Sequence, residues 1–315
     1  MKRILLSIPA SVIVLWAVYS SARAEEAVAM SFGGSTLALW NDEIALMRPM
    51  IEKEGYKFIT DDPQFKVEKQ VDDWKAWIAQ GNVKAIMGWP INAAAMVPVT
   101  KQAAEAHIPV IGYAVRWPGT AAALLTKPED DGKNLASFAV DWIKKSYGNE
   151  PVEVAVLSDE QNDLTRLRVK GLYEGVKSSI PNAKIYKIAA LSREDGYNAA
   201  KQQLIAHPKT TVWLSFTNDN MKGAYKALID SHVKVDDPKY FLAGMDVTNE
   251  DLDLIQIPDS IYRMAFAFRS QILARVNADF LIAAAKGQPV KDVSVEPELV
   301  VRENAKDFYV GKLAH

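Results

Sequence analysis

The sequence predicts an α/β protein built from two similar lobes, each a parallel sheet flanked by helices. Short apolar runs rich in β-branched residues recur at nearly regular spacing, and stretches with apolar residues three and four positions apart lie between them. This pattern occurs twice, once before about residue 126 and once after about residue 128. Apolar strands that alternate with helices are typical of parallel sheets covered by helices. The 315 residues also fit two domains of about 150 residues each.

Nine strands are predicted, and amphipathic helices are expected between them. In chain order the strands are 27–32, 56–60, 83–88, 109–113, 152–157, 185–189, 211–215, 240–243 and 260–266. Helical spacing of apolar residues is clear in two segments, at Trp74, Trp77 and Ile78 and at Leu167, Leu172 and Val176. We expect four tryptophans to be core residues: Trp74, Trp77, Trp142 and Trp213.

Residues 1–24 are predicted to be a cleaved signal peptide. Lys2 and Arg3 precede the apolar stretch 4–19, and small residues end in Ala22-Arg23-Ala24. A basic start, an apolar middle and an A-x-A cleavage site occur in the order that export requires. The stretch is shorter than the ~20 residues of a membrane span and contains a proline. We therefore expect cleavage after Ala24 and an exported protein.

Composition excludes several function classes. Lys and Arg number 37 against 39 Asp and Glu, so no broad basic field draws the chain to nucleic acid. Cysteine is absent, which removes thiolate metal sites and cysteine nucleophiles. The sequence has no G-x-G-x-x-G after the first strand, no P-loop, no G-x-S-x-G and no H-x-x-x-H. We expect no cofactor, no metal and no enzymatic activity.

Aromatic, charged and amide side chains follow the predicted strands. Ligands of open parallel sheets lie at the carboxyl ends of the strands, so these residues are the candidates for a binding site. Rings stack on the apolar face of a sugar, and charged or amide groups bind neighbouring hydroxyls, so a small polyhydroxylated ligand is indicated. The candidate ligand-binding residues are Phe32, Trp40, Trp89, Arg116, Arg168, Asn218 and Asp246.

The order of motifs resembles the type I periplasmic substrate-binding proteins of ABC importers, in the branch of ribose- and galactose-binding proteins. The resemblance covers nearly all of the chain after the signal peptide. Its more specific segments are Glu54-Gly55-Tyr56, Ala106-His107-Ile108-Pro109-Val110-Ile111, Arg166-Leu167-Arg168-Val169-Lys170-Gly171, Ala206-His207-Pro208, Asn218-Asp219-Asn220-Met221-Lys222-Gly223-Ala224 and Gly244-Met245-Asp246. A signal peptide stands where the repressors of this fold carry a DNA-binding headpiece.

The resemblance assigns ligand contacts to Arg168, Asn218, Asp246 and Trp40. The chain departs from the family after residue 111, where Arg116 is present but the family's preceding carboxylate is missing. Ala267 and Leu191 stand where the family has a glutamine and an aromatic residue. These departures imply a less polar pocket, suited to a monosaccharide, a deoxysugar or a small polyol.

The resemblance also implies two discontinuous lobes that close on the ligand. Crossings near residues 127, 267 and 296 would divide the chain into an N-terminal lobe of 25–127 and 268–296 and a C-terminal lobe of 128–267 and 297–315. The expected protein is a periplasmic monomer that delivers its ligand to an inner-membrane ABC permease with its ATPase. Two alternatives remain: a sensor-type binding protein that presents a non-sugar solute to a chemoreceptor or sensor kinase, and an enzyme on a similar scaffold.

Overall fold

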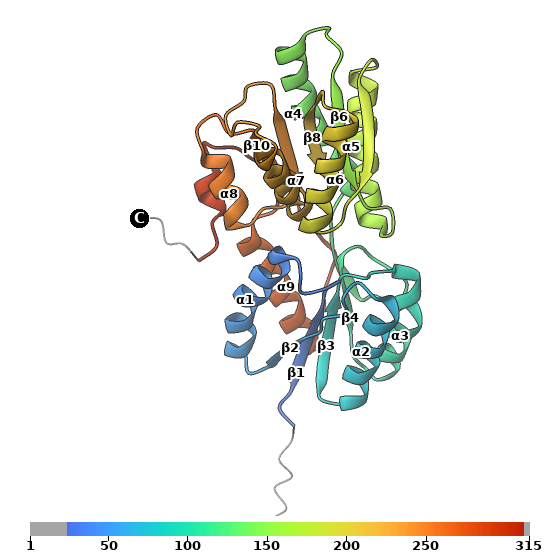
Figure 1. Ribbon diagram of the computed structural model, residues 1–315. Helices are drawn as coiled ribbons and strands as arrows, with labels where there is room; N and C mark the ends of the chain where they lie inside the picture. Colours follow the sequence, from blue (N-terminus) through green and yellow to red (C-terminus); the bar gives the residue numbers. More distant parts are fainter. Residues whose placement is uncertain (1–23, 312–315) are drawn as a thin grey trace, which may run out of the picture.

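A computed structural model describes residues 24–311 and contains two α/β lobes stacked end to end (Figure 1). Each lobe has one six-stranded sheet with helices on both faces. The predicted fold class is confirmed. The predicted signal segment lies outside the described residues apart from Ala24. Within residues 24–311, no helix is both long and apolar enough to cross a membrane.

The N-terminal lobe contains a fully parallel sheet in the order β11-β5-β4-β3-β1-β2. Its elements are β1 (Ala27–Ser31), α1 (Ala38–Lys53), β2 (Lys57–Thr60), α2 (Val67–Gln80), β3 (Val83–Gly88), α3 (Ala93–Glu105), β4 (Val110–Ala114), β5 (Ala122–Leu125), α9 (Ser270–Ala285) and β11 (Val293–Ser294). Trp74 and Trp77 of α2 are buried against the sheet, as their spacing predicts. A Cβ on Gly88 would lie 2.4 Å from the Trp74 ring, so glycine at this position lets α2 pack closely on β3.

The C-terminal lobe repeats the arrangement in the order β12-β10-β9-β8-β6-β7, and only β12 is antiparallel to its neighbour. Its elements are α4 (Pro128–Tyr147), β6 (Glu153–Ser158), α5 (Asp163–Ser179), β7 (Lys184–Ala189), α6 (Arg193–Ala206), β8 (Thr210–Ser215), α7 (Asn218–Asp230), β9 (Phe241–Met245), α8 (Asn249–Gln256), β10 (Tyr262–Ala267), β12 (Glu298–Val300) and the 3₁₀ turn η1 (Ala305–Phe308). Trp213 is fully buried, and Trp142 packs on Phe241 with ring centroids 5.1 Å apart.

All nine predicted strands are present, with ends shifted by no more than a few residues. Three short strands were not predicted: β5, β11 and β12. Of these, β11 has two residues and β12 has three, too few to show an apolar pattern.

The chain passes between the two sheets three times. The passages lie at 126–127 between β5 and α4, at 268–269 between β10 and α9, and at 295–297 between β11 and β12. After the last passage, the segment 301–311 packs on α8 and contacts the start of α9. The Gln271 side chain donates to the Tyr309 carbonyl at 2.8 Å, and the Arg269 guanidinium lies over the Phe308 ring.

Candidate ligand-binding site

A cavity of about 200 Å³ lies between the lobes, at the carboxyl ends of the strands of both sheets. The N-terminal lobe lines it with Leu37, Leu39, Trp40, Phe65, Val67, Trp89, Ile91, Asn92, Tyr113, Ala114, Leu124 and Thr126, together with Phe268 and Leu273. The C-terminal lobe lines it with Asp159, Gln161, Asn162, Leu164, Thr165, Arg168, Leu191, Phe216, Thr217, Asn218 and Asp246. A cavity of this size suits a small organic solute.

Arg168 and Asp246 form a buried ion pair on the wall contributed by the C-terminal lobe. One Arg168 nitrogen donates to Asp246 at 2.7 Å and to the Phe216 carbonyl at 3.0 Å, and a second lies 3.3 Å from the other Asp246 oxygen. Each charge offsets the cost of removing the other from water. Asp246 adopts a left-handed backbone conformation, with φ of 63°, directly after β9. Aspartate tolerates this conformation better than most residues, and such outliers concentrate at functional sites.

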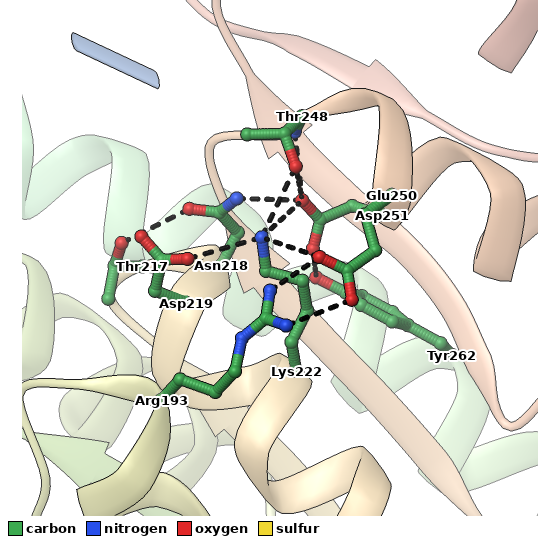
Figure 2. Close-up of polar contacts among 9 residues, drawn as sticks. All are labelled: Arg193, Thr217, Asn218, Asp219, Lys222, Thr248, Glu250, Asp251 and Tyr262. Atoms are coloured by element: carbon green, nitrogen blue, oxygen red, sulfur yellow. Dashed lines mark hydrogen bonds and ion pairs between the residues drawn. The ribbon is translucent and has the colours of Figure 1, made fainter. Parts of the chain in front are cut away.

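Asn218 begins α7, and a buried polar cluster fixes its amide (Figure 2). The amide nitrogen donates to Asp251 at 2.7 Å. The Lys222 ammonium is buried one turn further along and lies 3.1 Å from Asp219 and 3.4 Å from Asp251. Carboxylates on two sides therefore hold this lysine, and through Asp251 the cluster sets the orientation of Asn218. Lys222 is within a motif that the sequence analysis quoted, but its place in the cluster was not predicted.

The N-terminal lobe contributes an aromatic wall. The Trp40 ring lies 5.3 Å from that of Trp89 and 6.0 Å from that of Phe65, centroid to centroid, and all three line the cavity. Phe32 does not line it. The ring of Phe32 stacks behind Trp40 at 5.1 Å, because the residue after β1 turns into the lobe core. In this structure Phe32 therefore supports the Trp40 ring, and a ligand contact by Phe32 stays a prediction.

Arg116 is also outside this cavity. Its guanidinium donates to Asp292 at 2.6 and 2.7 Å and to the Thr120 carbonyl at 3.2 Å, and half of the side chain is exposed. Asp292 comes from the segment before β11, a strand that the sequence did not predict, so this partner could not be anticipated. Arg116 instead lines a second cavity that adjoins the first at Trp89 and Asn162.

A buried carboxyl group lies behind the aromatic wall. Glu43 of α1 accepts hydrogen bonds from the Tyr113 hydroxyl at 2.8 Å and from the Asn277 amide at 3.0 Å. Burial raises the pKa of Glu43 to about 8. Sequence reasoning missed this residue, although Trp40, Glu43 and Met47 recur at helical spacing and so share the buried face of α1.

Asn162 connects the two lobes across the rim of the cavity. Its side chain donates to the Pro90 and Ile91 carbonyls of the opposite lobe, at 3.2 and 3.0 Å. Its oxygen accepts from the Leu164 amide and caps α5. Asn162 follows β6 as the other site residues follow their strands, so that position is the signal that could have identified it.

Sequence reasoning also missed Phe268, because it considered the neighbouring residue Ala267 at this passage. Phe268 lies in the second passage between the lobes, one residue beyond Ala267, which is buried in β10. Phe268 lines the cavity where Ala267 does not.

Comparison with known proteins defines the class. A family model described as a periplasmic binding protein domain matches residues 28–289. The chain belongs to this family of periplasmic binding proteins. Among curated proteins, the galactofuranose-binding protein YtfQ of Escherichia coli (strain K12) is 27% identical over 223 residues. That match covers 67% of this chain and 65% of YtfQ, so the chain aligns with just under two thirds of that relative's length.

Solved structures share the fold over nearly the whole chain. A Mycobacterium smegmatis protein in complex with β-D-fucofuranose has a TM-score of 0.79 at 19% identity, covering 90% of this chain and 93% of that one. An Agrobacterium radiobacter carbohydrate transporter solute-binding protein in complex with D-arabinose also has a TM-score of 0.79 at 19% identity, with 90% and 97% covered. The Caulobacter myo-inositol-binding protein has a TM-score of 0.78 at 22% identity, with 89% and 94% covered.

Proposed function

We propose that this protein captures a monosaccharide, a deoxysugar or a small polyol between its lobes and delivers it to an ABC permease. The observation that carries the proposal is the cavity between the lobes, which combines an aromatic wall with the Arg168–Asp246 pair. Rings bind the apolar face of such a solute, and the ionic pair offers hydrogen bonds to its hydroxyls. Relatives named for galactofuranose and myo-inositol, and structures with fucofuranose and arabinose bound, support this ligand class.

Binding is coupled to closure of the lobes. Ligands select the conformation in which residues of both lobes reach the same molecule, and hinge closure is the known behaviour of periplasmic binding proteins. Here Trp40 and Trp89 would contact the solute from one lobe, and Arg168, Asn218 and Asp246 from the other. The three passages at 126–127, 268–269 and 295–297 are the segments about which the lobes would rotate.

The remaining parts of the proposal concern location and partners. The protein would act in the periplasm after cleavage behind Ala24, as a monomer, and the closed form would be recognised by an inner-membrane permease with its ATPase. The solute would be released chemically unchanged, because the family and the relatives named above are binding proteins.

A thermal-shift screen tests the ligand class. The chain without residues 1–24 is heated with sugars, deoxysugars and polyols, and with amino acids and nucleosides as the control set. A solute at 100 times its Kd stabilises the folded state by about 2.7 kcal/mol, which raises the melting temperature by several degrees. We expect a shift with at least one sugar or polyol and recovery of that solute unaltered. A shift with amino acids or nucleosides alone, or recovery of an altered solute, contradicts the proposal.

A further inference from the structure

The two halves of the cavity differ in chemistry. The N-terminal lobe, with Phe268 and Leu273, contributes no charged side chain to it, and most of its lining residues are aliphatic or aromatic. The aliphatic ones include Leu37, Leu39, Val67 and Leu124, which have neither a hydrogen-bonding group nor a flat ring to stack on a sugar. The charged lining residues, Asp159, Arg168 and Asp246, all belong to the opposite lobe.

Three polar side chains in the apolar half already make hydrogen bonds within the protein. The Tyr113 hydroxyl donates to Glu43 at 2.8 Å, and the Thr126 hydroxyl donates to the Ala114 carbonyl at 3.3 Å. The Asn92 side chain accepts from the Ala95 amide at 2.9 Å, as the N-cap of α3. Among residues 24–311, the Asn92 amide nitrogen and the Trp40 and Trp89 indole nitrogens make no hydrogen bond, so the side-chain donors that this half offers a ligand are few and uncharged.

The opposite half retains hydrogen-bonding capacity. Arg168 and Asp246 are buried on the cavity wall, and Asp159, Gln161 and Asn218 line it from the same lobe. Hydrogen bonds to charged groups are about twice as strong as those between neutral groups, so ligand hydroxyls gain most on this side of the cavity. The groups that bind polar ligand atoms most strongly are thus concentrated in the C-terminal lobe.

Resting on the function proposed above, we propose that the ligand is amphipathic, with hydroxyls along the edge that meets Arg168 and Asp246 and a methyl or larger apolar group against the N-terminal lobe. A hydroxyl placed against Leu39 and its aliphatic neighbours would lose its water without gaining a partner, whereas a methyl group there gains from burial. In a 6-deoxysugar this group is the methyl substituent of the ring, and in an alkyl or aryl glycoside it is attached to the anomeric oxygen.

Calorimetric titration with matched ligand pairs tests the inference. The deoxysugar arm compares D-galactose with 6-deoxy-D-galactose and L-mannose with 6-deoxy-L-mannose. The glycoside arm compares each free sugar with its methyl and phenyl glycosides. We expect the more apolar member to bind at least tenfold more tightly in one arm, and that arm identifies the source of the apolar group. Equal or tighter binding of every fully hydroxylated parent overturns the inference and leaves the proposed function intact. Binding of none of the pairs, with no sugar or polyol active in the thermal-shift screen, contradicts the proposed function itself.

Two leucine variants test where the apolar group lies. Leu39 and Leu191 are both half-buried leucines that line the cavity, one from each lobe. Leu39→Asn adds an amide to the apolar half and should reduce the preference for the apolar ligand to threefold or less. Leu191→Asn adds the same amide to the other half and should change both affinities by a similar factor, so that the preference persists. A preference that survives Leu39→Asn and is lost in Leu191→Asn contradicts the proposal.

Discussion

Glu43 is a carboxylic acid held in the protein interior, and this links the stability of the N-terminal lobe to pH. Its pKa rises from an ordinary 4.5 to about 8, because burial disfavours the charged form more than the hydrogen bonds from Tyr113 and Asn277 favour it. The folded state therefore binds the Glu43 proton more tightly than the unfolded state does. The stabilisation from this proton is fully present below about pH 4.5 and is lost as the pH rises through about 8.

Glu43→Gln should remove this contribution to the pH dependence. Between pH 5 and pH 8 the free energy of unfolding of the natural protein should fall relative to that of the variant, by an amount on the order of a few kcal/mol. Urea denaturation at pH 5, 6.5 and 8 measures both curves. Asp61 and Asp131, whose pKa values burial raises to about 7 and about 6, titrate in both proteins and cancel in the difference. Parallel curves would show that Glu43 does not titrate in this range.

The sequence alone can place a side chain at the site when that residue directly follows a strand or lies close after one. Trp89, Arg168, Asn218 and Asp246 all line the cavity, as the rule for parallel sheets implies. Arg116 lies outside this cavity, because its position depends on Asp292, a partner 176 positions away in the chain. Such a pairing leaves no local signal in the sequence.

At the scale of elements, Arg168 depends on the contact between α4 and α5. A Cβ on Gly171 would lie 2.1 Å from the Glu129 carbonyl, and one on Gly132 would lie 2.2 Å from the Arg168 carbonyl. The two glycines therefore let the helix backbones touch at the level of Arg168. This contact sets how far the guanidinium reaches toward Asp246.

Gly171→Ala should separate the two helices. We expect a loss of about 1–3 kcal/mol or more in the free energy of unfolding, because the added methyl meets backbone and not a movable side chain. Ligand affinity should fall as well, since Arg168 moves with α5. Glu174→Ala on the exposed face of the same helix is the matched control and should change stability by less than about 0.5 kcal/mol. Equal stability of the two variants in urea denaturation would contradict this account of the helix contact.

Strands were predicted correctly where the apolar pattern extends over several residues, and they were missed where the strand is too short to show a pattern. Strands such as β3, six residues with an apolar pattern, are visible in the sequence alone. The edge strands β11 and β12 are held by pairing with β5 and β10 and have no pattern of their own. Tertiary contacts create them, so their existence follows from the assembled sheet and not from local sequence.

At the scale of the whole molecule, the proposed site is shared by the two lobes. Asn162 already spans the rim to the Pro90 and Ile91 carbonyls, and the cavity walls come from both sheets. A ligand bound there would be held by residues of two lobes that the chain joins by three short passages. Removing contacts from either lobe alone should therefore weaken binding.

The most direct test is a calorimetric titration of the strongest solute from the screen into the natural protein, Asp246→Asn and Trp89→Leu. These variants remove one contact from each lobe, and thermal unfolding confirms that each is folded. We expect one site per chain in the natural protein and at least a tenfold loss of affinity, about 1.4 kcal/mol, in each variant. Natural affinity in both folded variants would show that the solute binds elsewhere and would contradict the assignment of the site.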